Sequence, residues 1–505
     1  LSIQDLSAAG HQPMKSSSGR YLMVYNGEIY NHLDLRKKLK YLDKQISWKG
    51  NSDTETLLNS FDNWGIEKTL SLCSGMFSIA VWDIKTKELT LIRDRSGEKP
   101  LYFGLVNNNF IFGSELKVFK KISSFDNEIS RDPLNLFLRF AYVPAPRSIY
   151  QNIYKLLPGA MLKITKNHLE KIINTKGNSY EKFKINKWWH AKEVFNLQST
   201  KIYSNEDKAI KDTEEVLTNS IKSQLISDVP VGTFLSGGID SSIVSTLMQK
   251  NLSTKIKTFT IGFENKYYDE SIYAKKIANY LGTEHNELIL SQNETLDIIP
   301  TLHKVYDEPF ADSSQVPTYL VSKLAKQKVK VSLTGDGGDE LFGGYNRYIY
   351  APKIIEYQKY PSILKKLFKR LISSFTPGQL NKILDKINKF LPSSYRFLSL
   401  PEKLYKLSEL IELNDQYQIY DSLISTWKKE TPSLLKNDNK DNLSENFYKI
   451  GSSFQERMML TDLNDYLIDD ILVKVDRAAM SNSLETRVPF LNQELVDFAL
   501  SIPLS

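Results

Sequence analysis

The hydrophobic pattern divides the chain into two halves with different predicted architectures. In residues 20–165, short apolar runs alternate with turn residues, which predicts strands and hairpins. The predicted strands are 21–25, 76–82 and 89–92, the last two joined by a turn over 83–87, and the predicted helices are 33–39 and 54–64. Helices combined with hairpins of this kind indicate an α+β layered domain built on an antiparallel sheet.

From about residue 206, strand-like runs alternate with amphipathic helical segments. The predicted strands are 229–235, 257–263 and 328–333, and the predicted helices are 205–226, a segment after Asp240, and 271–281. This alternation is typical of a doubly wound α/β domain, a parallel sheet that binds ligands at the carboxyl ends of its strands. Residues 350–450 add a mostly helical region.

A connection separates the two halves. Residues 170–205 lose the apolar periodicity and gather Asn, Lys and Ser, so we expect a connection there, with a domain boundary near 190–205. The predicted domains are therefore 1–190 and 205–505.

Composition excludes several classes of protein. The chain has 505 residues, 41% of them hydrophobic, which argues against a largely disordered protein. Its 66 Lys and Arg exceed its 59 Asp and Glu by only 7, which indicates scattered surface lysines and no nucleic-acid partner. A single cysteine, Cys73, excludes a disulfide framework and a Cys-rich zinc site. Without a long apolar run or a signal peptide, we expect a cytoplasmic protein that does not associate with membranes.

The first candidate for chemistry is a small-residue loop. Residues 236–242, Ser-Gly-Gly-Ile-Asp-Ser-Ser, follow an apolar strand and precede a helix. Backbone N–H groups and hydroxyls in such a loop can surround an anion at the positive end of the helix. Asp240 would repel phosphate unless a cation lay between them, which predicts Mg²⁺. A tight turn with a capping Ser or Asp explains the glycines but not the whole run.

A second loop carries a similar signal. Residues 334–345 follow the strand at 328–333, and three carboxylates fall within five residues there, interleaved with glycines. Such a group is costly without a metal or polyphosphate partner. Two loops of this kind at neighbouring strand ends predict a nucleotide and Mg²⁺ site.

The chain resembles the glutamine-dependent asparagine synthetases. The segments that show this resemblance are 236–242, 258–263, 307–309, 334–345, 472–477 and 485–491. The first resembles the pyrophosphate loop of the ATP-pyrophosphatase (adenine nucleotide alpha-hydrolase-like) fold. The resemblance implies that Ser236, Gly237, Gly238, Asp240 and Ser241 hold pyrophosphate, that Asp240 and Asp339 bind Mg²⁺, and that Phe234, Leu235, Ile261, Thr334 and Gly335 line a nucleoside pocket.

The first half resembles class II glutamine amidotransferases, which have an Ntn-hydrolase-like fold. Residues 25–31 resemble the oxyanion segment, where Asn26 and Gly27 would donate hydrogen bonds to the tetrahedral oxyanion, and Glu28 would contact glutamine. Asp53 matches the carboxylate that binds the α-amino group of glutamine, although its position also suits the N-cap of the helix at 54–64.

The sequence departs from the family pattern at both ends. The family nucleophile is an N-terminal Cys whose own α-amino group acts as the base, and residue 1 is Leu. Cys73 is expected to be a buried structural residue. The lysine that stabilises the adenylation and amidation transition states is expected beyond Ser505, and Lys474 does not match it by position. We therefore expect an interior fragment of a longer enzyme, inactive as a glutaminase in this form.

The resemblance implies an enzyme that hydrolyses glutamine and passes the ammonia through an interdomain channel to aspartate. ATP and Mg²⁺ would first convert the aspartate carboxylate into β-aspartyl-AMP, and a homodimer is expected. Three alternatives stay open: the same chemistry on another carboxylate such as a sugar acid, an RNA-modifying ATP pyrophosphatase, and a non-catalytic binding protein. The second would carry a Cys pair or a basic appendage, and the third would lack Asp240 or Asn26; neither departure is present.

Overall fold

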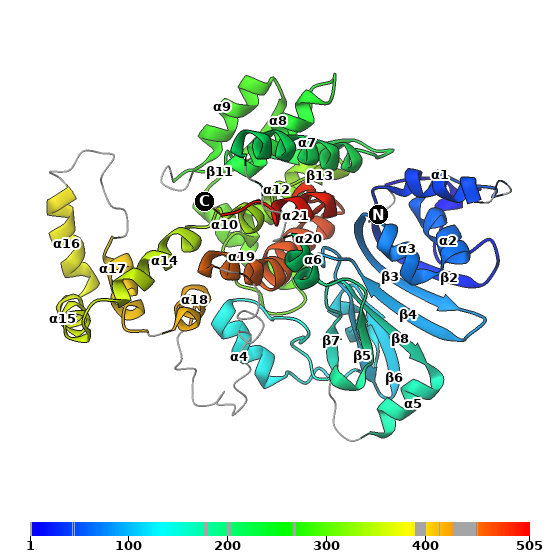
Figure 1. Ribbon diagram of the computed structural model, residues 1–505, viewed down its shortest axis with the longest axis horizontal. Coiled ribbons are helices and arrows are strands. Elements are labelled where there is room, and N and C mark those ends of the chain that lie inside the picture. The colour runs from blue at the N-terminus through cyan, green and yellow to red at the C-terminus, as the bar shows by residue number, and fades with distance from the viewer. Residues whose placement is uncertain are drawn as a thin grey trace. The chain divides into compact units, whose positions relative to one another are not determined.

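The computed structural model describes residues 3–42, 44, 46–175, 180–198, 203, 205–265, 269–388, 400–413, 415–427, 451 and 453–504. The chain forms two compact units (Figure 1). One runs to Phe342 and resumes at Leu463, and the other is Gly343–Asp462. The first unit contains both predicted sheets.

The N-terminal sheet is antiparallel, as predicted. Its order is β1-β2-β3-β4-β8-β9. The strands are β1 (Met14–Lys15), β2 (Tyr21–Ile29), β3 (Gly75–Asp83), β4 (Glu88–Arg93), β8 (Ala160–Thr165) and β9 (Ile185–Lys187). A second sheet, ordered β6-β5-β7, consists of β5 (Tyr102–Val106), β6 (Asn109–Gly113) and β7 (Ile153–Lys155).

The six-stranded N-terminal sheet is covered on both faces. On one face α1 (His32–Leu42), α2 (Asp53–Trp64) and α3 (Ile66–Leu72) bury a core that includes Leu35, Leu58 and Phe77. On the other face, Leu91 and Leu162 pack against Phe103 of the second sheet. This explains why β3 reads as a nearly continuous apolar run, since both of its faces are buried.

The C-terminal sheet is parallel, with the order β12-β11-β10-β13-β14. The strands are β10 (Val231–Phe234), β11 (Lys257–Phe263), β12 (Glu284–Leu290), β13 (Val331–Leu333) and β14 (Glu485–Arg487). The helices between them include α7 (Glu206–Gln224), α8 (Ile239–Lys250), α9 (Ser271–Leu281) and α12 (Gln315–Lys326). After β12 the chain returns to the other side of β10. The carboxyl ends of β10 and β13 therefore form a topological switch point, where doubly wound sheets bind ligands.

The unit Gly343–Asp462 is helical, as predicted for this region. It contains α14 (Asn346–Gln358), α15 (Ser362–Ser373), α16 (Pro377–Asn388), α17 (Leu400–Leu410), α18 (Gln416–Ile424) and most of α19 (Phe454–Asn464). Its core is anchored at Asp462, whose carboxylate accepts hydrogen bonds from Arg347, Tyr348 and Tyr420. The part of the helical prediction that falls on 389–399 and 428–450 lies outside the described residues.

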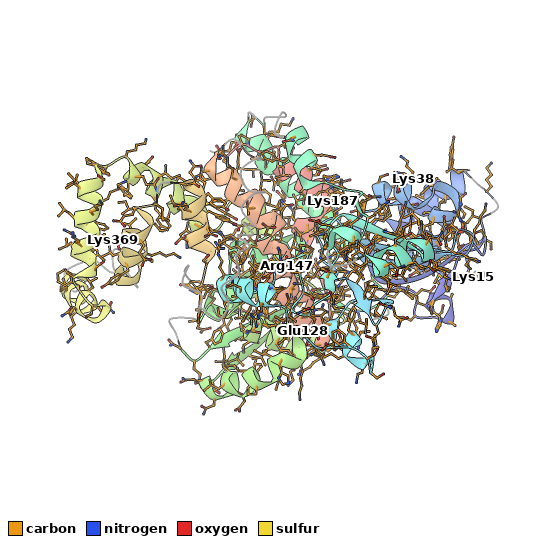
Figure 2. The ribbon with its side chains drawn as sticks, turned by 90° about the horizontal axis from the view of Figure 1, so that it is seen from below. Lys15, Lys38, Glu128, Arg147, Lys187 and Lys369 are labelled. Atoms are coloured by element: carbon orange, nitrogen blue, oxygen red, sulfur yellow. The ribbon has the colours of Figure 1, made fainter. Side chains whose placement is uncertain are left out.

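The predicted connection over 170–205 contains regular structure among its described residues, and 176–179, 199–202 and 204 lie outside them. The segment contains β9, which pairs with β8, and α6 (Ala191–Gln198). A strand of three residues is too short to show an alternating pattern, and it is recognised only by its pairing with β8. The predicted scatter of basic residues is visible in Figure 2, where Lys15, Lys38 and Lys187 lie on β1, α1 and β9.

Candidate active sites

The predicted oxyanion segment lies near the end of β2, with one edge open. Gly27 pairs with Phe77, whose N–H and C=O both bond Asp94 on the opposite side of β3. Gly27 therefore occupies a pair without mutual hydrogen bonds, and its N–H points away from β3. Tyr25 and Ile29 share this orientation, and their N–H groups donate to Gln12 and Asp53. The N–H of Gly27 lies between them on the same edge, as an oxyanion donor must.

Residue 27 must be glycine. Its φ of +153° is rarely adopted by other residues, and a Cβ would lie 2.1 Å from the Met76 carbonyl oxygen. Asn26 and Gly27 are both only half-buried, so their donors remain accessible to a substrate.

Asp53 is not the N-cap of α2, which resolves one alternative left open by the sequence. Ser52 is the N-cap, and its hydroxyl accepts the N–H of Glu55. The Asp53 carboxylate instead accepts hydrogen bonds from the Tyr25 hydroxyl at 2.6 Å and from the Ile29 N–H at 2.9 Å. Burial raises the pKa of Asp53, against the lowering effect of these hydrogen bonds.

Glu28 lies near Asp53 and is only partly neutralised. One oxygen, Oε2, pairs with Arg487 at 3.1 Å, while Oε1 is buried without a hydrogen-bond partner in the described part of the chain. Burial, then the charge of Asp53, raises the pKa of Glu28 well above its ordinary value. Two carboxylates in a buried setting favour a cationic ligand, and the α-ammonium group of an amino acid would satisfy both.

Cys73 is buried, as predicted, at the end of α3. Burial raises the pKa of its thiol to about 12, so the thiolate is not available near neutral pH. Cys73 is therefore a structural residue and not a nucleophile.

The two predicted nucleotide loops lie against one another. The loop after β10 is closed by hydrogen bonds between the Ser236 and Ser241 hydroxyls (2.9 Å) and from the Ser241 hydroxyl to the Gly238 carbonyl (3.2 Å). Residues of the loop after β13 come so close that a Cβ on Gly335 would lie 2.7 Å from the Ser241 nitrogen. The small residues of both motifs thus allow the loops to pack together at the switch point.

Asp240 lies where these loops meet. A Cβ on Gly338 would lie 2.6 Å from the Cγ of Asp240, so this glycine leaves room for the carboxylate. Burial, then the charges of Asp339 and Asp336, raises the pKa of Asp240 to about 6. Among the described residues, no three His, Cys, Asp or Glu side chains form a ready metal cage. Mg²⁺ is commonly held by one or two carboxylates with substrate phosphates and water, and this arrangement fits that pattern.

The predicted nucleoside pocket is only partly accessible. Phe234 and Ile261 are half-buried, whereas Leu235 and Thr334 are buried. The Leu235 N–H donates to Phe259, and its carbonyl accepts the Thr260 hydroxyl. Leu235 therefore has no N–H left for a nucleoside.

Lys474 is a buried cation that the sequence analysis set aside. It lies on α20 (Leu472–Ser481) and donates to the Asp312 carboxylate and to the Ser314 hydroxyl, both at 2.9 Å. Asp336 of the second nucleotide loop is near enough to help raise the pKa of Lys474 against burial. The sequence does contain a signal for this residue, because Lys474 lies inside the apolar run 472–475. A lysine on a buried helix requires an anionic partner.

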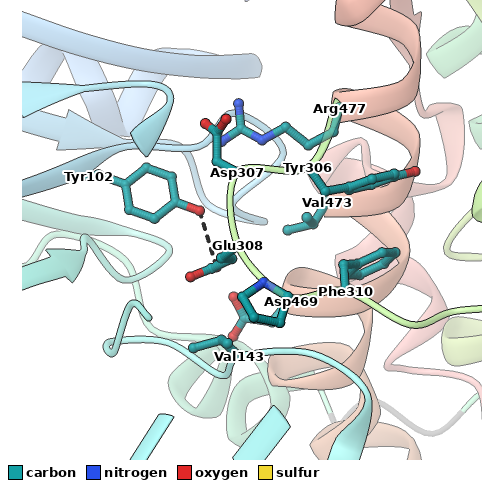
Figure 3. Close-up of a pocket in the computed structure, with 10 residues that line it drawn as sticks. Tyr102, Val143, Tyr306, Asp307, Glu308, Phe310, Asp469, Val473 and Arg477 are labelled. Atoms are coloured by element: carbon teal, nitrogen blue, oxygen red, sulfur yellow. Dashed lines mark hydrogen bonds between the residues drawn. The ribbon is translucent and has the colours of Figure 1, made fainter. Parts of the chain in front are cut away.

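A small pocket lies where the second sheet meets the C-terminal half (Figure 3). Tyr102 of β5 donates to Glu308 at 3.3 Å, and Lys155 of β7 pairs with Glu308 at 2.5 Å. Asp469 and Arg477 line the same pocket. These contacts join the two halves of the first compact unit through buried charges.

No helix among the described residues is both long enough and apolar enough to cross a bilayer.

Comparison with known proteins matches a different family model to each half of the chain. Residues 212–505 match the asparagine synthase family model, and residues 1–175 match the glutamine amidotransferase domain model. The chain is 32% identical to asparagine synthetase [glutamine-hydrolyzing] 1 of Bacillus subtilis, over 100% of this chain and 73% of the relative. It is 33% identical to a putative asparagine synthetase [glutamine-hydrolyzing] 2 of Methanocaldococcus jannaschii, over 97% of this chain and 90% of the relative.

A third relative, asparagine synthetase [glutamine-hydrolyzing] 3 of Bacillus subtilis, is 27% identical over 100% of this chain and 73% of its own length. Among solved structures, the Bacillus subtilis glutamine phosphoribosylpyrophosphate amidotransferase matches 65% of this chain and 59% of its own, at 14% identity and a TM-score of 0.25. That superposition is too loose to bear on the assignment. Because two family models and relatives at 32% and 33% identity match it, the chain belongs to the asparagine synthetase family.

Proposed function

We propose that this protein makes asparagine from aspartate, using ATP and the amide nitrogen of glutamine. The observation that carries the proposal is the meeting of loops 236–242 and 334–340 at the switch point, with Lys474 beside Asp336. The same compact unit holds the paired carboxylates Glu28 and Asp53, which fit the α-ammonium group of glutamine. We assign the glutaminase domain to residues 1–190 and the synthetase domain to 205–505.

In the glutaminase half, the carboxylates fix the substrate and the strand edge stabilises the reaction. Asp53 and the free oxygen of Glu28 bind the α-ammonium group. The Gly27 N–H and the Asn26 side-chain amide donate to the oxyanion that forms when the cysteine thiolate of the family adds to the glutamine amide carbon. Ammonia then leaves, and water hydrolyses the resulting thioester to glutamate. Donors fixed in advance on a strand cost little reorganisation and act most strongly at that stage.

In the synthetase half, the aspartate carboxylate attacks the α-phosphorus of ATP, and pyrophosphate leaves as β-aspartyl-AMP forms. Ser236, Gly237, Gly238 and Ser241 hold the pyrophosphate by N–H and hydroxyl groups at the start of α8. Asp240 and Asp339 would hold Mg²⁺, which neutralises phosphate charge when bound. Ammonia then attacks the activated carbonyl carbon, and AMP leaves as the amide forms.

Lys474 supplies the positive charge that this step needs. Its ammonium group is held by Asp312 and Ser314 within a buried helix, close to the loop that carries Asp336. We assign to it the stabilisation of the charge that accumulates on the phosphate and then on the carbonyl oxygen.

The test is a stoichiometric assay on the protein at its full natural length. With aspartate, ATP and Mg²⁺, asparagine, AMP and pyrophosphate should form in equal amounts with either glutamine or ammonia, and glutamate only with glutamine. Replacing aspartate by a sugar acid should stop AMP formation. Amide formation on the sugar acid but not on aspartate would contradict the proposed acceptor. Sedimentation of the same sample tests the expected homodimer.

A further inference from the structure

We propose that Arg487 is a positioning residue shared by the two half-reactions, which fixes Glu28 at the glutamine site and Thr334 at the nucleotide site. This inference rests on the proposed function. Arg487 ends β14, the edge strand of the synthetase sheet, and its side chain is completely buried.

On the glutamine side, the contact is made by the guanidinium group. Its Nη2 donates to Glu28 Oε2 at 3.1 Å, leaving Glu28 Oε1 without a protein partner in the described chain. Arg487 thus sets which oxygen of Glu28 faces the ligand. Glu28 follows Asn26 and Gly27 on β2. A shift of its side chain would therefore change the distance between the site for the ammonium group and the oxyanion donors.

On the nucleotide side, the contact is made by the main chain. The carbonyl of Arg487 accepts the N–H of Thr334 at 3.0 Å. Thr334 is the first residue after β13 and begins the loop that packs against Asp240 and Ser241. Arg487 therefore contacts both Thr334, at the start of the nucleotide loop, and the Glu28 carboxylate at the proposed glutamine site.

The geometry of the guanidinium group makes this residue stiff. Its Nε donates to Glu485 at 2.8 Å, and its Nη1 donates to the Gln224 and Ile226 carbonyls at 2.6 and 2.8 Å. With Glu28, four acceptors are held by one planar fork, which a lysine ammonium cannot reproduce from a single nitrogen. A displacement of Thr334 when the nucleotide site fills is therefore transmitted to Glu28.

The test uses Arg487→Lys, Glu28→Asp and the double variant in the protein at its full natural length. Glu28→Asp keeps the charge but shortens the side chain away from Arg487. We expect each single variant to raise the KM for glutamine at least tenfold while the kcat of glutamate release stays within about threefold. In the ammonia-dependent reaction, Arg487→Lys should also raise the KM for ATP, because the strand end whose carbonyl accepts the Thr334 N–H loses its guanidinium anchors to Glu485, Gln224 and Ile226. Glu28→Asp leaves those anchors in place and should not raise it.

Two further measurements separate positioning from general structural damage. If Arg487 acts through Glu28, the KM of the double variant for glutamine should be no higher than that of the single variant with the higher KM. Saturating ATP, Mg²⁺ and aspartate should lower the KM for glutamine in the wild type, and this response should disappear in Glu28→Asp. The second measurement does not depend on the folding of Arg487→Lys.

Lys99→Gln is the matched control. Lys99 and Asp476 form another buried ion pair between the two halves, at 3.0 Å and with 3% and 7% of their side chains exposed. It should leave the KM for glutamine and its response to ATP unchanged. Additive effects in the double variant, or the same shifts in Lys99→Gln, would overturn the proposal. A wild type that forms asparagine from neither nitrogen donor would instead contradict the proposed function.

Discussion

Replacing Asp240 by Asn should raise the stability of the ligand-free protein while lowering its activity. Burial and the neighbouring Asp339 and Asp336 raise the pKa of Asp240 from 3.8 to about 6. A shift of about 2 pKa units corresponds to about 3 kcal/mol. Because the side chain is partly exposed, solvent screening reduces this to about 1–2 kcal/mol. The ionised carboxylate thus destabilises the folded protein when no cation is present.

The sign of the pH dependence follows from the raised pKa. The favourable contribution of protonated Asp240 is complete below about pH 4 and is lost as the pH rises through about 6. Asn has no charge to lose, so its advantage should be absent near pH 4, grow between about pH 4 and 6, and be complete above about pH 6. At pH 8 without nucleotide or Mg²⁺, we expect the Asn variant to unfold a few degrees above the wild type.

Activity should change in the opposite direction. Loss of the anionic ligand should weaken Mg²⁺-dependent ATP–pyrophosphate exchange at least tenfold, about 1.4 kcal/mol. Scanning calorimetry between pH 4 and 8, with EDTA or with Mg²⁺ and ATP, checks the first effect, and isotope exchange checks the second. Asp297→Asn, at an exposed position on α10 (Gln292–Ile298), is the control and should change neither. An Asn variant with wild-type exchange would remove Asp240 from the metal site, and equal unfolding temperatures at pH 8 would refute the electrostatic reasoning.

Three further predictions separate the two sites. Asn26→Ala should lower glutamine hydrolysis by about 10²–10³, because a transition-state donor is lost, while ammonia-dependent synthesis survives; a fall in both would make Asn26 structural. Lys474→Met should lower ammonia-dependent synthesis at least a hundredfold and destabilise the fold by about 1–3 kcal/mol, because the half-buried Asp312 loses its charged partner and keeps only its hydrogen bonds from Ser314. A Lys474→Met, Asp312→Leu double variant should recover stability in urea unfolding but not activity; recovered activity would refute the assigned role. Cys73→Ala should keep both activities, measured as glutamate and AMP formation, and a loss of glutaminase alone would contradict its structural role.

Local patterns were sufficient for most of the fold. The predicted helix 271–281 matches α9 because a polar stretch precedes it and Gly282, with φ +69°, ends it. The hairpin of β3 and β4 forms across residues 83–87 as expected. The pairing of β9 with β8 depends on contacts between distant segments, which no local window contains. For the same reason, the position of β14 beside β13 appears only in the folded chain.

The site shows a similar division. Loops whose chemistry is written in consecutive residues, such as 236–242, could be located from sequence, and the structure places them against 334–340. Asp53 had two equally suitable interpretations, and only the position of the Ser52 hydroxyl distinguishes them. Arg487 was visible as part of a motif, but its contact with Glu28 joins residues 459 positions apart.

The charges around Lys474 bear on the role proposed for it. Lys474 lowers the pKa of Asp312, so this pair is ionised near neutral pH, whereas burial and then Asp312 raise the pKa of Asp470 to about 8. At pH 7, Asp470 is therefore mostly protonated, and the charge of Lys474 is balanced chiefly by Asp312, with Asp336 next. An ammonium group held in this way lies in a region of low dielectric with its position fixed before substrate arrives. Such a group interacts with developing negative charge far more strongly than a lysine in water would.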